Sequence, residues 1–223
     1  MRVDFSMEFK AILFDLDGTL LDTLEDLGNS VNRVLAERGF PTHDLDRYRY
    51  FVGDGAMMMI TRALPKQKRK NDVIQACVDE FKKDYSKNWK VKTRLYDGIA
   101  EMLDELKARN LKLAVLSNKP HQFTKQSVDK LLSNWRFEIV LGQRDAVPRK
   151  PSPEGALEIA EHLNTKPENI IYLGDSDVDM QTAVAAGMFP VGVLWGFRSA
   201  KELKDSGAKA LVERPSEVLS LLR

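Results

Sequence analysis

Two aspartates near the amino terminus carry the strongest chemical signal in this 223-residue sequence. Asp15 and Asp17 come directly after residues 10–14, whose apolar run is typical of a short buried strand in a parallel sheet. Gly18 and Thr19 follow them and add a flexible backbone and a hydroxyl. Because ligands of open α/β sheets bind at the carboxyl ends of the strands, this pattern predicts phosphoryl transfer through an aspartate. The alternative is an Asp-Gly turn that the threonine caps.

Three further polar segments are expected at the same edge of the sheet. They are Ser117-Asn118 after residues 111–116, Lys150 within a proline-stiffened stretch, and Gly174-Asp175-Ser176-Asp177-Val178-Asp179 after residues 170–173. Taken singly, each has an ordinary interpretation as a strand-to-helix turn, a solvated loop cation or a helix N-cap. Their convergence on one edge, in the order that a phosphate site requires, favours a functional interpretation.

The charges of this set explain why its members must act together. A carboxylate about 3.5 Å from a phosphate oxygen is opposed by roughly 5 kcal/mol per charge pair. We expect a hard divalent cation, Mg²⁺, to offset this repulsion through Asp15, the backbone carbonyl of Asp17, and Asp175, while Lys150 adds positive charge. The set expected to bind the phosphate oxygens is Gly18, Thr19, Ser117, Asn118 and Lys150.

The elements that must position these residues alternate between strands and helices. Strands are expected at residues 10–14, 111–116, 137–141, 170–173 and 190–194, and helices at residues 120–132, 153–163 and 177–186. Such βαβ units have right-handed crossovers and build parallel sheets. The pattern therefore predicts an α/β core with a doubly wound, Rossmann-like parallel sheet.

The segment between the first strand and the rest of this pattern has a different character. It shows helical periodicity and no strand pattern between Asp22 and Lys92, and a connection of this length is unusual within a compact domain. We therefore predict a small all-helical cap at residues 22–93, inserted after the first strand. The core is then made of residues 1–21 and 94–223, with hinges at Asp22-Thr23 and residues 93–96.

The composition argues against several other classes of protein. The 34 Lys and Arg residues nearly balance the 33 Asp and Glu residues, so no overall charge favours a nucleic-acid or membrane partner. The basic residues at 66–70 are interpreted as a solvated loop. Cys77 is a single cysteine, no stretch approaches the roughly 18 apolar residues of a membrane span, and the amino terminus is too polar for a signal peptide. We expect a cytoplasmic monomer or weak homodimer, with residues 1–6 as a short extension before an alternative start at Met7.

The four polar segments resemble the four motifs of the haloacid dehalogenase superfamily of aspartate-dependent phosphotransferases, in the same order and over nearly the whole chain. The resemblance implies that Asp15 is the nucleophile that forms an aspartyl-phosphate. It implies that Asp17 protonates the leaving group and then activates water. By the same resemblance, Asp179 orients the water shell of the metal or Lys150. Asp22 and Asp177 are interpreted as a hinge contact and a helix N-terminal charge.

The helical insert is similar to the mobile cap of this superfamily, which closes over small substrates and excludes water. Residues 51–55, 117–120 and 195–199 look most like those of phosphoglycolate phosphatases. The resemblance implies a small phosphorylated metabolite as substrate, with 2-phosphoglycolate as the first choice. It also implies that the cap recognises the substrate through Phe51, Val52, Gly53, Asp54 and Gly55. The alternative for this turn is a simple connection between two helices.

Other functions stay open at this stage. A β-phosphoglucomutase uses the same acid to serve a sugar hydroxyl, and a pyrophosphatase uses the same machinery on a different substrate. Asp17 argues against a dehalogenase and against phosphonate-cleaving relatives, which do not need this second aspartate. The alternative outside enzymes is an inactive metabolite sensor.

Overall fold

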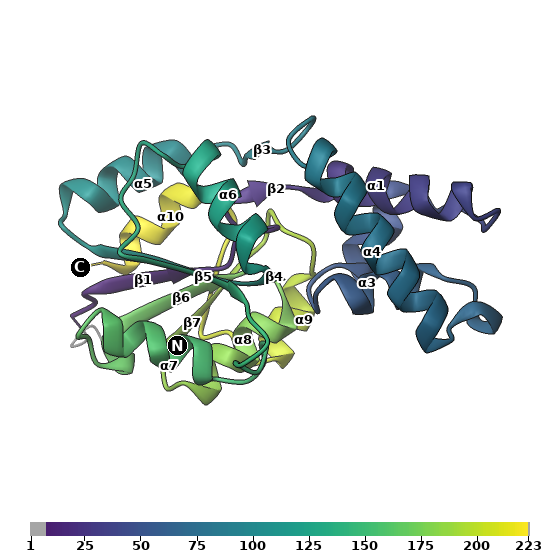
Figure 1. Ribbon diagram of the computed structural model, residues 1–223. Helices are drawn as coiled ribbons and strands as arrows, with labels where there is room; N and C mark the ends of the chain where they lie inside the picture. The colour runs from purple at the N-terminus through teal and green to yellow at the C-terminus, as the bar shows by residue number, and fades with distance from the viewer. Residues whose placement is uncertain (1–7, 223) are drawn as a thin grey trace.

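The computed structural model describes residues 8–222, so the expected extension at residues 1–6 and the alternative start at Met7 lie outside it. Figure 1 shows a layered α/β core beside a group of helices, with a narrow connection between them. The first strand and the carboxyl-terminal half of the chain build the core, and residues from the first third of the chain build most of the helical group.

A six-stranded parallel sheet forms the centre of the core. Its order is β5-β4-β1-β6-β7-β8, and every neighbouring pair is parallel. The strands are β1 (Ala11–Phe14), β4 (Lys112–Pro120), β5 (Ile139–Gln143), β6 (Ile170–Gly174), β7 (Phe189–Val193) and β8 (Ala210–Val212). The predicted α/β fold with a parallel sheet is confirmed. The chain order reverses on either side of β1, and such a switch point is where open α/β sheets bind ligands.

Helices cover both faces of this sheet, as Figure 1 shows. On one face lie α5 (Ile99–Ala108), α6 (His121–Leu131) and α10 (Pro215–Val218), and on the other lie α7 (Glu154–His162), α8 (Asp177–Ala185) and α9 (Ala200–Asp205). Ile12 and Phe14 of β1 pack in the first layer, and Ala11 and Leu13 pack in the second. Side chains of a strand alternate between its faces, so a strand buried on both sides is apolar throughout.

Two strands differ from the sequence prediction. We expected a strand to end at residue 116, but β4 continues through Ser117 and Asn118 to Pro120, with a register shift after Leu116. The polar residues continue the strand because Pro120 still pairs with Gln143 of β5. Strand β8 at the sheet edge is short and only half buried, which explains why its pattern was not recognised.

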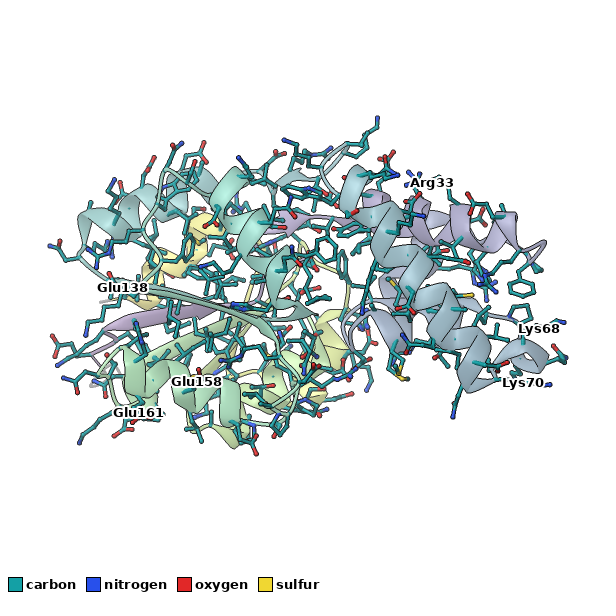
Figure 2. The ribbon with its side chains drawn as sticks, in the orientation of Figure 1. Arg33, Lys68, Lys70, Glu138, Glu158 and Glu161 are labelled. Carbon is teal, nitrogen blue, oxygen red and sulfur yellow. The ribbon has the colours of Figure 1, made fainter. Side chains whose placement is uncertain are left out.

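The helical group contains α1 (Leu24–Glu37), α2 (Leu45–Phe51), α3 (Ala56–Ala63) and α4 (Asn71–Asn88). These helices pack around an apolar cluster of their own, which includes Val31, Tyr48, Ile60 and Phe81. Figure 2 shows the labelled charged side chains of Arg33, Lys68 and Lys70 on the outside of this group. Residues 66–70 are exposed, as expected of a solvated loop.

Two short strands connect the helical group with the core. These strands, β2 (Leu21–Asp22) and β3 (Arg94–Leu95), pair in antiparallel fashion. The Asp26 carboxylate accepts hydrogen bonds from the backbone N–H of Lys92 and from the backbone N–H and hydroxyl of Thr93, so it ties the two connections together. The domain boundaries at residues 22–93 stay our proposal.

Short 3-10 helices complete the described chain, at η1 (Lys66–Lys68), η2 (Pro167–Asn169) and η3 (Leu219–Leu221). Over residues 8–222, none of the helices combines the length and the apolar character that a membrane crossing requires.

Candidate active site

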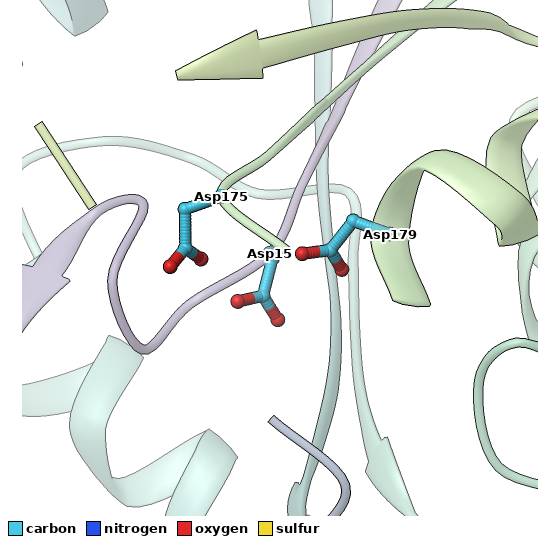
Figure 3. A group of neighbouring side chains, drawn as sticks. All are labelled: Asp15, Asp175 and Asp179. Carbon is cyan, nitrogen blue, oxygen red and sulfur yellow. The ribbon is translucent and has the colours of Figure 1, made fainter. Parts of the chain in front are cut away.

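Three carboxylates meet at the carboxyl edge of the sheet. Asp15 follows β1, Asp175 follows β6, and Asp179 lies in the first turn of α8. Figure 3 shows the three side chains converging, and one oxygen of each lies within 4.8 Å of the others. All three are buried. The sheet topology therefore brings together acids that are far apart in the sequence.

Lys150 supplies the positive charge within this cluster. Its Nζ lies 2.7 Å from Oδ1 of Asp15, 2.6 Å from Oδ1 of Asp179, and 3.1 Å from the carbonyl oxygen of Leu116. The Lys150 ammonium carries three N–H donors, and these three contacts use them all. Lys150 is thus a fixed part of the carboxylate cluster and not the solvated loop cation of the alternative interpretation.

The side chain of Asn118 makes hydrogen bonds to the backbone of Lys150 and is therefore not free. Its side-chain oxygen accepts from the Lys150 N–H at 3.0 Å, and its Nδ2 donates to the Lys150 carbonyl at 3.1 Å. The same Nδ2 also donates to the carbonyl of Gly53 at 3.0 Å. In this structure Asn118 therefore positions the lysine and contacts the cap, and its phosphate-binding role stays a prediction.

The remaining polar contacts keep Asp175 and Asp179 in place. The Thr19 hydroxyl donates to Asp175 at 3.2 Å, and the backbone N–H of Phe197 donates to the same carboxylate at 2.8 Å. Ser176 caps α8 and donates its N–H and its hydroxyl to Asp179. A Cβ at Gly18 would lie 2.4 Å from Asp175, so only glycine allows this close approach.

The crowding of carboxylates changes their proton affinity. Burial raises the pKa of Asp15 well above its usual value; Lys150 opposes the rise, and Asp179 and Asp175 add to it. Burial and then Asp179 raise the pKa of Asp175 to about 7. Three buried carboxylates face one buried ammonium here, which leaves an excess of negative charge. This oxygen-rich donor set fits a hard divalent cation such as Mg²⁺.

Asp17 lies at the same edge but has a different partner. Both of its carboxylate oxygens accept hydrogen bonds from Nζ of Lys119, at 2.9 and 3.1 Å. The same ammonium donates to the hydroxyl of Tyr85 in α4 at 2.8 Å. Burial opposes the charge of Lys119, but Asp17 and Tyr85 outweigh it and raise its pKa. Lys119 belongs to residues 117–120, whose resemblance to phosphoglycolate phosphatases was noted, but no role was expected for it, and Tyr85 was not expected at the site.

The cap lies directly on this edge of the core through two arginines, Arg49 and Arg198, which we call the arginine clasp. Arg49 of the cap donates to the carbonyl of Gly196 at 3.1 Å. Arg198 of the core donates to the carbonyl of Val52 at 2.9 Å and to the carbonyl of Arg49 itself. Arg149 adds a hydrogen bond to the carbonyl of Asp54 at 3.1 Å. These four hydrogen bonds hold the helical group against the core edge.

A cavity with an empty volume of about 510 Å³, its open mouth included, lies between cap and core. Its lining consists of Asp15, Asp17, Leu27, Val52, Gly53, Gly55, Ala56, Met59, Phe81, Tyr85, Ser117, Asn118, Lys119, Pro120 and Phe123. Three members of the predicted cap turn thus reach the cavity. The other two do not, because Phe51 packs against His43 and Tyr48 and the Asp54 side chain pairs with Arg62.

The other residues singled out from the sequence have structural contacts. Trp195 donates its indole N–H to the carbonyl of Thr19 at 2.9 Å and so supports the first motif. Asp22 lies in β2, 3.6 Å from Arg94, and Asp177 is the first residue of α8. Cys77 is buried in the cap.

Residues 12–193 match the family model described as "Haloacid dehalogenase-like hydrolase", and the chain belongs to this family. The recognition of this superfamily from its motifs is thereby confirmed. The chain is 32% identical over 213 residues to a phosphoglycolate phosphatase of Aquifex aeolicus, with 96% of both proteins covered. It is 30% identical to the N-acetylmuramic acid 6-phosphate phosphatase of Pseudomonas putida, with 97% of both covered.

A solved structure agrees with these relatives. A crystal structure from Haemophilus somnus, described as a predicted phosphoglycolate phosphatase, superposes with a TM-score of 0.90 at 28% identity. The superposition covers 98% of this chain and all of the other. The protein is therefore an enzyme of the phosphatase class within the haloacid dehalogenase-like hydrolases.

Proposed function

We propose that the protein is a Mg²⁺-dependent phosphatase that hydrolyses a small phosphorylated metabolite, first of all 2-phosphoglycolate, through an aspartyl-phosphate on Asp15. One observation carries the proposal. The Asp15 carboxylate, held by Lys150 at 2.7 Å, lines the cavity between cap and core together with Asp17. A nucleophile and a proton donor thus face the same small space.

The first half-reaction transfers the phosphoryl group to the enzyme. A carboxylate oxygen of Asp15 attacks phosphorus, the new O–P bond forms, and the bond to the leaving alcohol breaks with its electron pair. Asp17 gives its proton to the leaving oxygen, which departs as a neutral alcohol. The closed cap keeps bulk water away from the phosphoryl group during this transfer.

The second half-reaction returns the enzyme to its starting state. Asp17, now a carboxylate, accepts a proton from a water molecule, and the oxygen of that water attacks phosphorus. The bond between phosphorus and the Asp15 oxygen breaks, so that inorganic phosphate is released and Asp15 is regenerated. One residue therefore acts as acid in the first step and as base in the second.

The surrounding residues stabilise the charges of both steps. Lys150 keeps its ammonium on the nucleophile, while Ser117 and the backbone after Asp17 are proposed to bind the phosphate oxygens. Asp15, Asp175 and the carbonyl of Asp17 would hold Mg²⁺, with Asp179 orienting its waters or Lys150. The ion supplies positive charge next to the phosphate oxygens when it is bound.

The choice of substrate is supported by the cavity and by the relatives. A cavity that lies beneath the cap suits a small metabolite rather than a phosphorylated protein. Relatives named phosphoglycolate phosphatase cover nearly the whole chain. We propose that the enzyme acts in the cytoplasm as a monomer or weak homodimer, without nucleic-acid or membrane partners.

A metabolite screen tests this function. Phosphate release is measured with 2-phosphoglycolate, β-glucose 1-phosphate, pyrophosphate and N-acetylmuramic acid 6-phosphate, with Mg²⁺ and with EDTA. We expect the highest kcat/KM for 2-phosphoglycolate, no turnover in EDTA, and recovery when Mg²⁺ is restored. Isomerisation of the sugar phosphate without phosphate release would identify a mutase, and binding without any turnover would identify a sensor. Rapid-quench mass spectrometry should find the phosphoryl group on Asp15.

A further inference from the structure

Lys119 is a buried cation to which none of the four family motifs assigns a role. Its side chain has only 4% of its surface exposed, and its ammonium donates to both oxygens of Asp17 and to the hydroxyl of Tyr85. It also lies 4.8 Å from the centroid of the Tyr85 ring. A buried ammonium is costly unless it is paired, so this lysine always needs an anion beside it.

Lys119 differs from the other described residues of the cavity wall in its positive charge. Among the described residues that line the cavity, Lys119 is the single basic side chain, and the cap contributes mainly apolar groups from Leu27, Val52, Met59 and Phe81. Lys150 lies beside the cavity, but its three donors are already used within the carboxylate cluster. A second anionic group on a bound substrate therefore has one cation to meet, namely Lys119.

Asp17 cannot serve the leaving group while it keeps its present contacts. Both of its oxygens point at the ammonium, and at least one has to be released before it can reach the oxygen that leaves phosphorus. A neutral substrate offers Lys119 no anion in exchange. A singly charged anion does, because its carboxylate can take the place of the Asp17 carboxylate beside the ammonium.

We propose that Lys119 is the counter-ion of a substrate carboxylate, and that this carboxylate displaces Asp17 from the ammonium and so frees Asp17 to act on the leaving group. This inference rests on the proposed function and deepens it, because it names the residue that recognises the carboxylate of the substrate and links that contact to the release of Asp17. A second phosphate group fits less well, since its additional negative charge would lie next to Asp17 with no further cation beside it.

The closing experiment compares two esters that differ only in this charge. They are 2-phosphoglycolate and carbamoylmethyl phosphate, in which a neutral amide replaces the carboxylate. We expect the wild-type enzyme to prefer 2-phosphoglycolate by about 100-fold in kcat/KM, as is typical for loss of a buried charge partner. Lys119→Met should lower kcat/KM for 2-phosphoglycolate by about 100-fold, mainly through KM, because Asp17 is free once the ammonium is gone, while kcat/KM for the amide ester should not fall.

Two further variants serve as controls. Lys119→Arg keeps the positive charge and should retain most of the preference for the carboxylate. Lys125→Met removes an exposed lysine of α6 and should leave both esters unchanged. If Lys119→Met does not fold, as judged by circular dichroism, the ratio of kcat/KM between the two esters still tests the inference in the wild-type enzyme and in Lys119→Arg.

The outcomes separate this inference from the proposed function. Equal losses on both esters in Lys119→Met would show that the lysine only positions Asp17, and equal wild-type rates for both esters would remove the carboxylate from recognition. Either result overturns the inference and leaves a phosphatase in place. If the wild-type enzyme hydrolyses neither ester and none of the other phosphate esters in Mg²⁺, the proposed function fails, and the inference fails with it.

Discussion

The edge of the core and the inner face of the cap are built in opposite ways. At the core edge, side chains such as Asp15, Asp179 and Lys150 contact one another directly. The cap instead offers backbone carbonyls, at Arg49, Val52, Gly53 and Asp54, to donors of the core. Apart from the Tyr85 hydroxyl, the cap side chains that line the cavity are apolar.

The core edge and the cap should therefore differ in how they tolerate amino-acid substitutions. A carbonyl is present whatever the residue type, so contacts of the cap backbone survive substitution of the cap residues. A carboxylate at the core edge has no substitute. We therefore expect substitution of the core-edge carboxylates to slow the reaction most, and the contacts of the cap backbone to be sensitive mainly to loss of their core donors.

The largest effect is expected for Asp15→Asn. The amide cannot attack phosphorus, so turnover should fall by on the order of 10⁴- to 10⁶-fold, as is found for loss of an enzyme nucleophile. The fold should persist, because Lys150 keeps Asp179 and the Leu116 carbonyl as partners. Steady-state kinetics and thermal denaturation measure the two quantities. Asp145→Asn, at an exposed aspartate, is the control. Appreciable turnover by pure Asp15→Asn protein would remove Asp15 from the nucleophile role.

The second largest effect is expected for Asp17→Asn. Loss of a general acid and base costs about 10²- to 10⁴-fold, and here both half-reactions should be slower. Acetyl phosphate sharpens the result, because acetate leaves without a proton. With this substrate rapid-quench measurements should show normal formation of the phosphoenzyme and slow hydrolysis. Unchanged hydrolysis of the phosphoenzyme would contradict the assignment of Asp17 as the base.

A smaller effect is expected when the arginine clasp is broken from the core side. Arg198→Met removes the donor to two cap carbonyls, and we expect kcat/KM to fall by about 10-fold, because a hydrogen bond from a charged group contributes about 1.5–3 kcal/mol. The melting temperature should change little, since the cap keeps its own apolar core. Arg136→Met removes an exposed arginine and serves as the control. If the two variants have the same kinetics, the clasp does not contribute to closure.

The sequence predicted the core edge well for a physical reason. Apart from Lys150, each motif directly follows a buried apolar run, and the geometry of parallel strands then brings Asp15, Ser117 and Asp175 to the same edge without any knowledge of the intervening chain. The acids at the start of α8 carry a local signal too, since Ser176 and Asp179 form a capping box. These interactions are local, or follow from the topology of the sheet.

The interface between cap and core could not be predicted in the same way. Lys119 lies in a segment that the sequence singles out, but its burial and its partners do not follow from the sequence, because they depend on Asp17 and on Tyr85 from a helix elsewhere in the chain. Asn118 was expected to contact phosphate, yet its amide binds the backbone of two segments whose proximity no sequence pattern reveals. Helix α2 is short and has one fully buried side chain, Tyr48, so its helical periodicity is weak.

Without metal, the excess negative charge of the core edge should make the stability of the protein depend on pH. Burial and Asp179 raise the pKa of Asp175 to about 7, above its usual value of 3.8. The folded protein without metal therefore binds a proton more tightly than the unfolded chain does, and its stability falls as the pH rises from about 4 to about 7. We expect Asp175 to contribute a decrease of about 1 kcal/mol in the free energy of unfolding per pH unit in this window, in the same direction as the raised pKa of Asp15.

Urea denaturation in EDTA at pH 5, 6 and 7 measures this slope. The same series with Mg²⁺ measures how far the ion reduces the loss of stability with rising pH. The ion should stabilise the protein more at pH 7 than at pH 5, because it competes with fewer protons at the carboxylates. Asp175→Asn should flatten the slope in EDTA and weaken the response to Mg²⁺. If Asp175→Asn keeps the full slope, the pH dependence arises elsewhere, and the excess negative charge at the core edge does not control stability.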